Sequence, residues 1–145
     1  MYKHILIPTD GSELSEKAIR EGVALAKSVK AKVTGITVFS PFHTFALAPM
    51  MVTDTSEQYP KDCQALGDKY LGVITDTAKL AGVSCDVVQT EHEHPYQAII
   101  DSATKLGCDL IFMASHGRRG VSALLLGSET TKVLTHSRIP VLVCR

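Results

Sequence analysis

The segment from residue 114 to residue 130 carries the residue types that bind phosphate groups. Its glycines are Gly117, Gly120 and Gly127. A backbone without Cβ atoms can approach a phosphate closely. Ser128 follows the last glycine, where its hydroxyl can cap a helix that begins there. Because the free N–H groups and the positive dipole end of such a helix attract anions, the segment is a candidate phosphate site.

Two arginines, Arg118 and Arg119, follow the first of these glycines and could add positive charge to the same region. A second interpretation of the loop stays open. The glycines can serve only to make turns, and Ser128 can serve only to cap a helix. The loop therefore needs another feature beside it before a binding site is favoured.

That other feature is Asp10, in the run PTDGS that follows the first predicted strand. The carboxyl ends of parallel strands meet at one edge of a sheet, so Asp10 is expected at the same edge as the glycine loop. A carboxylate there can accept a hydrogen bond from a ribose hydroxyl or an adenine amine. Its alternative role is to stabilise the start of the first helix.

Strand and helix patterns alternate along the whole chain, which indicates a parallel sheet covered by helices on both faces. The predicted strands are residues 3–8, 32–39, 83–90, 109–114 and 139–144. The run 109–114 is almost wholly apolar, as expected for a central parallel strand. It leads directly into the glycine loop.

The predicted helices carry start and stop signals. Ser12 is placed to cap the first helix, and Gly22 in the middle of its apolar stripe indicates close packing against the sheet. A longer helix is predicted over residues 58–81, ending at Gly82. Its predicted inward side holds Cys63, Leu66, Tyr70, Val73 or Ile74, Thr77 and Ala81.

Pro95 is predicted to open the next helix and Gly107 to end it. Residues 40–57 show no clear period and are predicted to form a long loop or a short lid. Met50 and Met51 in this stretch could cover a ligand or make a plain apolar contact.

Length and charge limit the possible functions. With 145 residues, the chain is expected to be a single domain, residues 1–145. Fifteen Lys and Arg balance fifteen Asp and Glu, so no overall field draws the molecule to nucleic acid or to an anionic membrane. No apolar run approaches the roughly 20 residues of a membrane span.

The cysteines show no CxxC pair and are expected to be reduced and buried in a cytoplasmic protein. They are Cys63, Cys85, Cys108 and Cys144.

Several enzyme motifs are absent from the sequence. Neither GxxxxGK(S/T) nor GxGxxG occurs, and GxSxG, HxGH and SGGxDS are also missing. No residue pair near the loop resembles a general base beside an activated nucleophile, so rapid catalysis is not expected. His92 and His94 could bind a metal ion, but a polar turn with incidental histidines is the favoured interpretation.

The chain resembles the universal stress protein family over essentially its whole length. The resemblance rests on the opening strand with PTDGS, the second strand up to Val38, and the closing block GSETTKVLTHSRIPVLVCR. ATP-binding members of this family carry glycine, two residues, glycine, nine residues, then Gly-Ser or Gly-Thr. Gly117 and Gly127-Ser128 match the nine-residue spacing, whereas Ala114 stands where the first glycine is expected. The extra methyl group would crowd a nucleotide slightly without excluding it.

The resemblance implies an adenine-nucleotide site. Thr9 and Asp10 would border the adenosine, Val38 would lie against the adenine, and Ala114 and Gly117 would line the ribose and phosphates. The residues implied in nucleotide binding are Pro8, Thr9, Asp10, Val38, Met113, Ala114, His116, Gly117, Arg119, Gly127, Ser128, Glu129 and Thr130. The last four would hold the phosphates through backbone N–H and hydroxyl groups.

The expected fold class is α/β, with one open five-stranded parallel sheet of order 3-2-1-4-5. Such a sheet is flavodoxin-like and similar to the adenine-nucleotide α-hydrolases, with two helices on each face. Its last strand would be an exposed apolar edge, which proteins normally pair or cover. The resemblance implies a homodimer formed through that strand, from Pro140 to Cys144.

The leading functional expectation is a cytosolic stress-response or regulatory module that binds ATP, or else AMP or ADP, with slow or no hydrolysis. Mg²⁺ would be carried mainly by the phosphates, because the loop offers few carboxylates beyond Glu129. A regulatory protein partner is expected but not identified, and neither nucleic acid nor a membrane is expected as a partner. Two alternatives stay open. One is a nucleotide-free dimeric interaction module, which Ala114 slightly favours, and the other is a genuine slow ATPase, which needs a general base.

Overall fold

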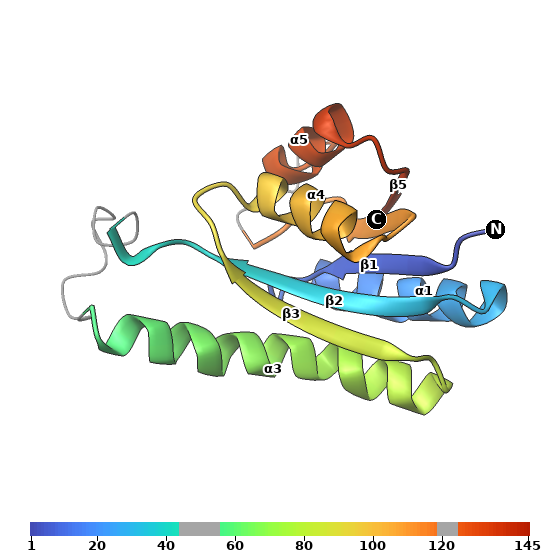
Figure 1. The fold of residues 1–145 in the computed structure, drawn as a ribbon, viewed down its shortest axis with the longest axis horizontal. Coiled ribbons are helices and arrows are strands. Elements are labelled where there is room, and N and C mark those ends of the chain that lie inside the picture. The colour runs from blue at the N-terminus through green and yellow to red at the C-terminus, as the bar shows by residue number, and fades with distance from the viewer. Residues whose placement is uncertain (44–55, 119–124) are drawn as a thin grey trace.

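The structure is a computed structural model that describes residues 1–43, 56–118 and 125–145 (Figure 1). Its five-stranded parallel sheet has the order β3-β2-β1-β4-β5. The strands are β1 (His4–Pro8), β2 (Lys32–Phe39), β3 (Cys85–Glu91), β4 (Leu110–Ala114) and β5 (Val141–Cys144). The helices are α1 (Glu13–Val29), α3 (Gln58–Ala81), α4 (Pro95–Leu106) and α5 (Ser128–His136). The predicted α/β class and strand order are confirmed.

Helices cover both faces of this sheet, with α3 below it and α4 and α5 above it in Figure 1. The helices α1 and α3 enclose one core, to which β1 contributes Ile7 and α3 contributes Ile74. The helices α4 and α5 enclose a second core around Leu6 and Ile99. Neighbouring residues of β1 thus enter opposite cores, as the two-residue period of a strand requires.

The strands β1 and β4 are hydrogen-bonded neighbours at the centre of the sheet, with Leu6 opposite Ile111. Every residue of β4 is buried, as its apolar sequence predicts. Because the two strands run in the same direction, the segments that follow Pro8 and Ala114 leave the sheet at the same edge. The fold therefore brings the PTDGS run and the glycine loop together.

The start of α1 follows the prediction. Ser12 is its N-cap residue, and its Oγ accepts a hydrogen bond from the amide of Ser15 (3.2 Å). In the middle of the helix, a Cβ on Gly22 would lie 2.7 Å from Cδ1 of Ile7. The glycine therefore allows α1 to lie close against the sheet, which confirms the predicted close packing.

The predicted inward side of α3 is wrong by about one residue. The side chain of Leu66 is 44% exposed, whereas Gly67, Leu71, Ile74 and Ala78 are buried. Small residues face the sheet here. At Gly67 the space that a Cβ would need is taken by the Gln89 side chain from β3, whose Nε2 would lie only 1.3 Å from that Cβ. A pattern search that scores only large apolar residues cannot detect a face built partly from glycine and alanine.

The other element boundaries agree closely with the expected ones. Gly82 and Gly107 end α3 and α4 with positive φ angles of 71° and 69°, and Pro95 opens α4. The last strand begins only after Pro140. No helix in the described ranges is long and apolar enough to cross a membrane. Most of the predicted lid, including Met50 and Met51, lies outside the described residues.

The cysteines only partly match the expectation. All four are free thiols, but only two of them are buried and the other two are half-buried. The buried ones are Cys108 and Cys144. Burial raises the pKa of the Cys108 thiol to about 11. For Cys144, burial and the nearby Glu21 carboxylate likewise raise the pKa to about 11, so both thiols are protonated at neutral pH.

Candidate functional site

The segments after β1 and β4 are joined by a hydrogen bond at the carboxyl edge of the sheet. The amide of Arg118 donates to Oδ2 of Asp10 (2.7 Å). The other carboxylate oxygen, Oδ1, accepts from the amide of Ser12 (3.0 Å), in the turn that starts α1. Asp10 therefore holds together the two loops that sequence reasoning assigned to the nucleotide.

Gly117 lies against the same carboxylate. A Cβ at this position would stand 2.4 Å from Oδ2 of Asp10, which is far inside van der Waals contact. The glycine is thus needed for the approach of the two loops, in addition to any role toward a ligand. Asp10 and Gly117 form one structural feature.

Hydrogen bonds keep Asp10 ionised. Burial alone would raise the pKa of this carboxyl group, but the bonds from Ser12, Arg118 and Ser15 outweigh burial and lower the pKa below its ordinary value. A carboxylate has about four acceptor positions. Two backbone amides occupy part of this capacity. The Ser15 hydroxyl, which also faces the carboxylate, donates to the carbonyl of Ser12 (2.8 Å), so Asp10 can still accept a hydrogen bond from a ligand.

Tyr70 of α3 completes this side of the site, although sequence reasoning did not assign it there. Its ring lies under the guanidinium of Arg118, 4.8 Å from ring centre to Cζ, and its hydroxyl accepts a hydrogen bond from Arg118. The ring also packs over Gly11, where a Cβ would lie 2.1 Å from Cε1 of Tyr70. Gly11 has φ +76°, which favours glycine as well. In the sequence, Gly11 was the one residue that could have indicated this contact.

The helix α5 presents its first turn to the same edge. Gly127, not Ser128, is its N-cap residue, and Ser128 is the first helical residue, with no side-chain cap. The predicted cap is therefore wrong by one position. The amide of Gly127 donates to the carbonyl of Ser115 (2.7 Å), and a Cβ on Gly127 would lie 3.2 Å from that oxygen. This close approach favours glycine at the cap position.

The amides of residues 128–130 have no hydrogen-bond acceptor within α5. The first hydrogen bond inside the helix runs from the amide of Thr131 to the carbonyl of Gly127 (3.0 Å). The three amides before it have no intrahelical acceptor, as at every helix start. They point out from the positive end of the helix dipole, which is a suitable place for an anion.

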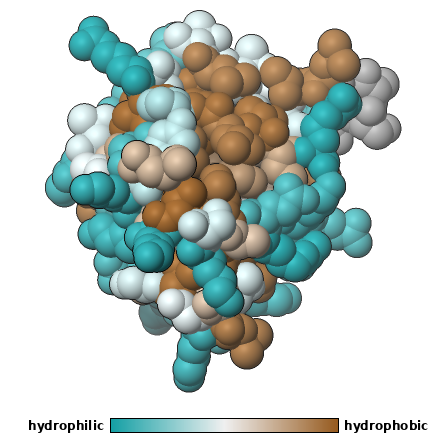
Figure 2. Space-filling view, turned by 90° about the vertical axis from the view of Figure 1, so that its right-hand side faces the viewer, coloured by the Kyte–Doolittle hydropathy of each residue, from teal (hydrophilic) through white to brown (hydrophobic). Residues whose placement is uncertain are grey.

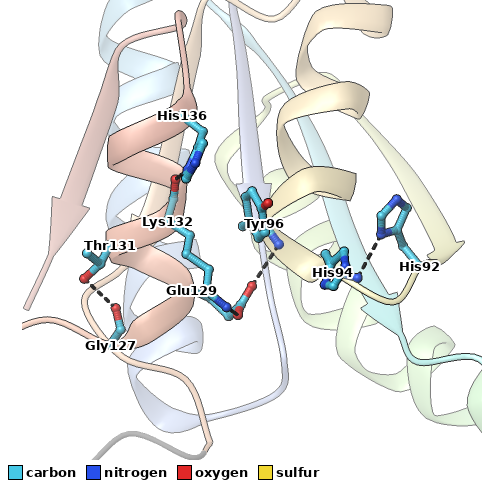
Figure 3. Close-up of polar contacts among 8 residues, drawn as sticks. All are labelled: His92, His94, Tyr96, Gly127, Glu129, Thr131, Lys132 and His136. Carbon is cyan, nitrogen blue, oxygen red and sulfur yellow. Dashed lines mark hydrogen bonds and ion pairs between the residues drawn. The ribbon is translucent and has the colours of Figure 1, made fainter. Parts of the chain in front are cut away.

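The side chains of Glu129 and Thr130 fasten α5 to its surroundings. The hydroxyl of Thr130 donates to the carbonyl of Ala114 at the end of β4 (3.0 Å). Oε2 of Glu129 accepts from the amide of Tyr96 in α4 (2.9 Å; Figure 3). The resemblance implied that backbone N–H and hydroxyl groups of this turn hold the phosphates, whereas in this structure the Thr130 hydroxyl binds the protein and the backbone amides face outward.

His116 lies beside the N-cap of α5 and is only 8% exposed. Its Nδ1 is 3.0 Å from the hydroxyl of Ser115. Its Nε2 is buried and has no hydrogen-bond partner within the described part of the chain. Because an unpaired buried polar atom is costly, this nitrogen is a natural contact for a ligand.

The remaining predicted site residues lie on or near the central strands. Thr9 is buried, with its hydroxyl 3.1 Å from that of Ser15, and Pro8 is half-buried at the end of β1. Val38 and Met113 both belong to the core beneath α4 and α5. Arg119 lies outside the described residues.

Other candidate sites are less well developed. The ring nitrogen Nδ1 of His92 accepts from the amide of His94 (2.9 Å), so it serves the turn before α4. Within the described ranges, no three His, Cys, Asp or Glu side chains converge as a metal site. Two shallow surface hollows lie elsewhere, one beside Lys17 and Arg20 on α1 and one around Gly82.

The sequence matches the universal stress protein family over residues 1–145. Universal stress protein MJ0531 of Methanocaldococcus jannaschii is 31% identical over 153 aligned residues, which cover 100% of this chain and 83% of that protein. Among solved structures, the hypothetical protein MJ0577 aligns with a TM-score of 0.80 at 27% identity, covering 99% of this chain and 95% of that chain.

Two further solved structures share the fold at lower identity. A universal stress protein in complex with cAMP aligns with a TM-score of 0.68 at 22% identity, covering 99% of this chain and 97% of its own. The universal stress protein from Archaeoglobus fulgidus in complex with dAMP also aligns with a TM-score of 0.68, at 16% identity. The alignment covers 99% of this chain and 98% of that one. From the full-length family match and the archaeal relative, the chain belongs to the universal stress protein family.

Proposed function

We propose that the edge formed by Asp10, Gly117 and the first turn of α5 binds an adenine nucleotide, with ATP and Mg²⁺ as the leading ligand. One observation carries the proposal. An ionised carboxylate and the first-turn amides of α5, which have no acceptor within that helix, lie at the same edge of the sheet, and Gly117 and Gly127 keep their own positions there free of side chains. The carboxylate suits the hydroxyl or amine donors of a nucleoside, and the amides suit its phosphates.

The residues at this edge fit a nucleotide. Nε2 of His116 is a buried polar atom without a partner in the described ranges, and the same residue adjoins the N-cap of α5 through its Cα and Cδ2 atoms. Ser128 is exposed at the first helical position, where its amide and hydroxyl are available to a phosphate. Arg118 lies beside Asp10 and contributes positive charge.

The comparisons support an adenine nucleotide as the class of ligand. Two proteins with this fold were solved with cAMP and with dAMP, both of which carry adenine and a single phosphate group. Their identity to this chain is 22% and 16%, so they support the fold-level placement of a ligand and not individual contacts.

In the proposed complex, Asp10 accepts from the adenosine, and Val38 and Met113 border the adenine. The amides of residues 128–130 take the phosphates. Mg²⁺ stays on the phosphates, because the Glu129 carboxylate is already occupied by Tyr96 and Lys132.

Hydrolysis in this site is proposed to be slow or absent. Asp10 is a weak base because its pKa is lowered by hydrogen bonds that outweigh burial. Its two oxygens also hold the backbone of both loops. Phosphate release followed over hours tests this part of the proposal, and turnover near or above about one per second contradicts it.

We also propose that the protein is a homodimeric regulatory module of the cytoplasm that signals to a protein partner. The strand β5 is at the end of the sheet, and Leu142 on it is 39% exposed. Figure 2 shows hydrophobic surface gathered in the upper part of the face that it draws. An exposed apolar edge strand favours pairing with a second copy. Light scattering at micromolar concentration tests this, and a protein that stays monomeric contradicts it.

A nucleotide-free interaction module is the second candidate, and Ala114 is the observation that favours it. The residue is buried at the end of β4, where the family's ATP-binding pattern has glycine. Thermal unfolding with and without ATP and Mg²⁺ separates the two candidates. Binding stabilises the folded chain by about 2.7 kcal/mol when ATP is at a hundred times its Kd. Unchanged unfolding at millimolar ATP favours the nucleotide-free module.

A further inference from the structure

A carboxylate of α5 caps the start of α4. His94, the N-cap residue of α4, makes no side-chain capping hydrogen bond, and Pro95 after it has no N–H group. The next amide, that of Tyr96, donates to Oε2 of Glu129 in the first turn of α5 (2.9 Å; Figure 3). The neighbouring helix thus supplies the cap that α4 lacks within its own sequence.

Lys132 and His136 surround this contact. Nζ of Lys132 is 3.1 Å from Oε1 of Glu129 and 5.6 Å from the centre of the Tyr96 ring. Nδ1 of His136 donates to the carbonyl of Lys132 (2.8 Å), and its ring centre is 5.2 Å from that of Tyr96. Because the Glu129–Lys132 pair is partly exposed, its effect on stability is small. Its effect on geometry is to keep Glu129 directed at α4.

The first turn of α5 is therefore fixed from two sides. Toward β4, Thr130 donates through its hydroxyl to Ala114, and Gly127 donates through its amide to Ser115. Toward α4, Glu129 accepts from Tyr96. The amides of residues 128–130 lie between these anchors, so the direction in which they point depends on both.

We propose that Glu129 is a positioning residue that couples phosphate binding at α5 to the start of α4 through Tyr96. This inference rests on the proposed nucleotide site. The carboxylate does not take the phosphate, since the Tyr96 amide and Lys132 occupy it. Phosphate binding and the Glu129–Tyr96 bond both favour the same placement of the first turn of α5. By linkage, each event then strengthens the other.

The proposed coupling affects some ligands and not others, which a purely structural role of Glu129 would not do. Removing the carboxylate should weaken the binding of phosphorylated nucleotides and spare adenosine, because adenosine depends on the loop of Asp10. Binding of ATP should in turn slow hydrogen exchange at the amide of Tyr96, which does not touch the proposed ligand. A residue that only stabilised the fold would affect all ligands alike.

The test compares Glu129→Ala, Glu129→Gln and the control Asp101→Ala with the unsubstituted chain. Asp101 is an exposed carboxylate of α4 that accepts from Gln97 (2.8 Å). Calorimetric titration gives Kd for ATP with Mg²⁺, for AMP and for adenosine. Amide exchange at Tyr96 is followed by NMR with and without ATP, and thermal unfolding of the free proteins establishes that each variant is folded.

Glu129→Ala is expected to weaken ATP and AMP binding about tenfold, by analogy with the low end of the loss that follows removal of a group orienting a metal ligand. Glu129→Gln should largely restore it, because a carbonyl oxygen still accepts from Tyr96, and Asp101→Ala should leave every Kd unchanged. The inference is overturned if a folded Glu129→Ala variant keeps the original Kd for ATP, or if ATP leaves Tyr96 exchange unchanged in the unsubstituted chain. Failure of the unsubstituted chain to bind any nucleotide refutes the proposed function itself.

Discussion

The carboxylate of Asp10 occupies the space that a side chain on Gly117 would need. A Cβ on Gly117 would lie 2.4 Å from Oδ2, and the amide of Arg118 donates to this same oxygen (2.7 Å). The glycine motif and the aspartate are far apart in the sequence but form one contact across the carboxyl ends of β1 and β4. The geometry of the proposed nucleotide site therefore depends on this contact.

Replacing Gly117 by leucine should abolish nucleotide binding and leave the sheet intact. The new side chain would displace Asp10 and separate the two loops, at a cost of about 1–3 kcal/mol typical of overpacking. Titration with ATP measures binding, and circular dichroism measures the fold. Gly72→Leu is the matched control, because nothing lies within 4 Å of a Cβ at that position. Normal ATP affinity in Gly117→Leu would place the ligand elsewhere.

Asp10 should contribute stability at neutral pH that is lost in acid. Its pKa is lowered in the folded state by hydrogen bonds that outweigh burial, so the unfolded chain binds the proton more readily. The contribution is complete above the unfolded pKa of about 3.9 and disappears as pH falls through the lower folded value. Asp10→Asn should lower the free energy of unfolding at pH 7 by about 1 kcal/mol, with a smaller difference near pH 3. A difference that does not change with pH contradicts this assignment.

The sequence predicted the sheet order and the edge at which the candidate residues meet. The reason is physical, since a buried strand such as β4 and a capped helix such as α1 leave clear periodic and terminal signals. The contact partners of individual side chains were harder to predict from the sequence. Nothing in the sequence indicates that the Glu129 side chain accepts from the amide of Tyr96, because that contact depends on how two helices cross.

The side of α3 that packs against the sheet was also predicted incorrectly. Its inward side was predicted from large apolar residues, but the packing uses Gly67 to admit Gln89 from β3. The position of Tyr70 over Gly11 was also missed, since a tyrosine on a helix gives no sign of the loop that it covers. Both features depend on contacts between segments that lie far apart in the sequence.

His4 is expected to make the protein less stable in mild acid. The residue is buried, and its Nε2 lies 2.7 Å from the hydroxyl of Thr34. Burial and the positive charge of Lys32 lower its pKa from 6.5, against opposing effects of Leu106, Asp109 and Asp86. The unfolded chain therefore takes up a proton first as pH falls, and stability is lost below about pH 6.5. Denaturant unfolding of the original chain and of His4→Gln at pH 7.5 and 5.5 measures this. Equal pH dependence in both proteins contradicts the prediction.

The two glycines within α3 should respond differently to alanine. Gly72→Ala fills open space and should raise the free energy of unfolding by up to about 1 kcal/mol, because alanine favours the helix. Gly67→Ala should gain less or lose stability, since Gln89 must move and give up its hydrogen bond to the carbonyl of Cys63 (2.9 Å). Urea unfolding of the two variants gives the comparison. Equal stabilisation at both positions would show that Gln89 is not held there.

Calorimetric titration of nucleotide-free protein with ATP and Mg²⁺ measures whether the edge formed by Asp10, Gly117 and the first turn of α5 binds a nucleotide. A Gly127→Leu variant, in which the new Cβ would lie 3.2 Å from the carbonyl of Ser115, serves as the comparison. We expect saturable binding with a Kd at or below about 1 mM, which corresponds to about −4 kcal/mol or better, and loss of that binding in a folded variant. Absence of binding by the unsubstituted chain at millimolar ATP, AMP and ADP, or equal binding by both proteins, would contradict this expectation.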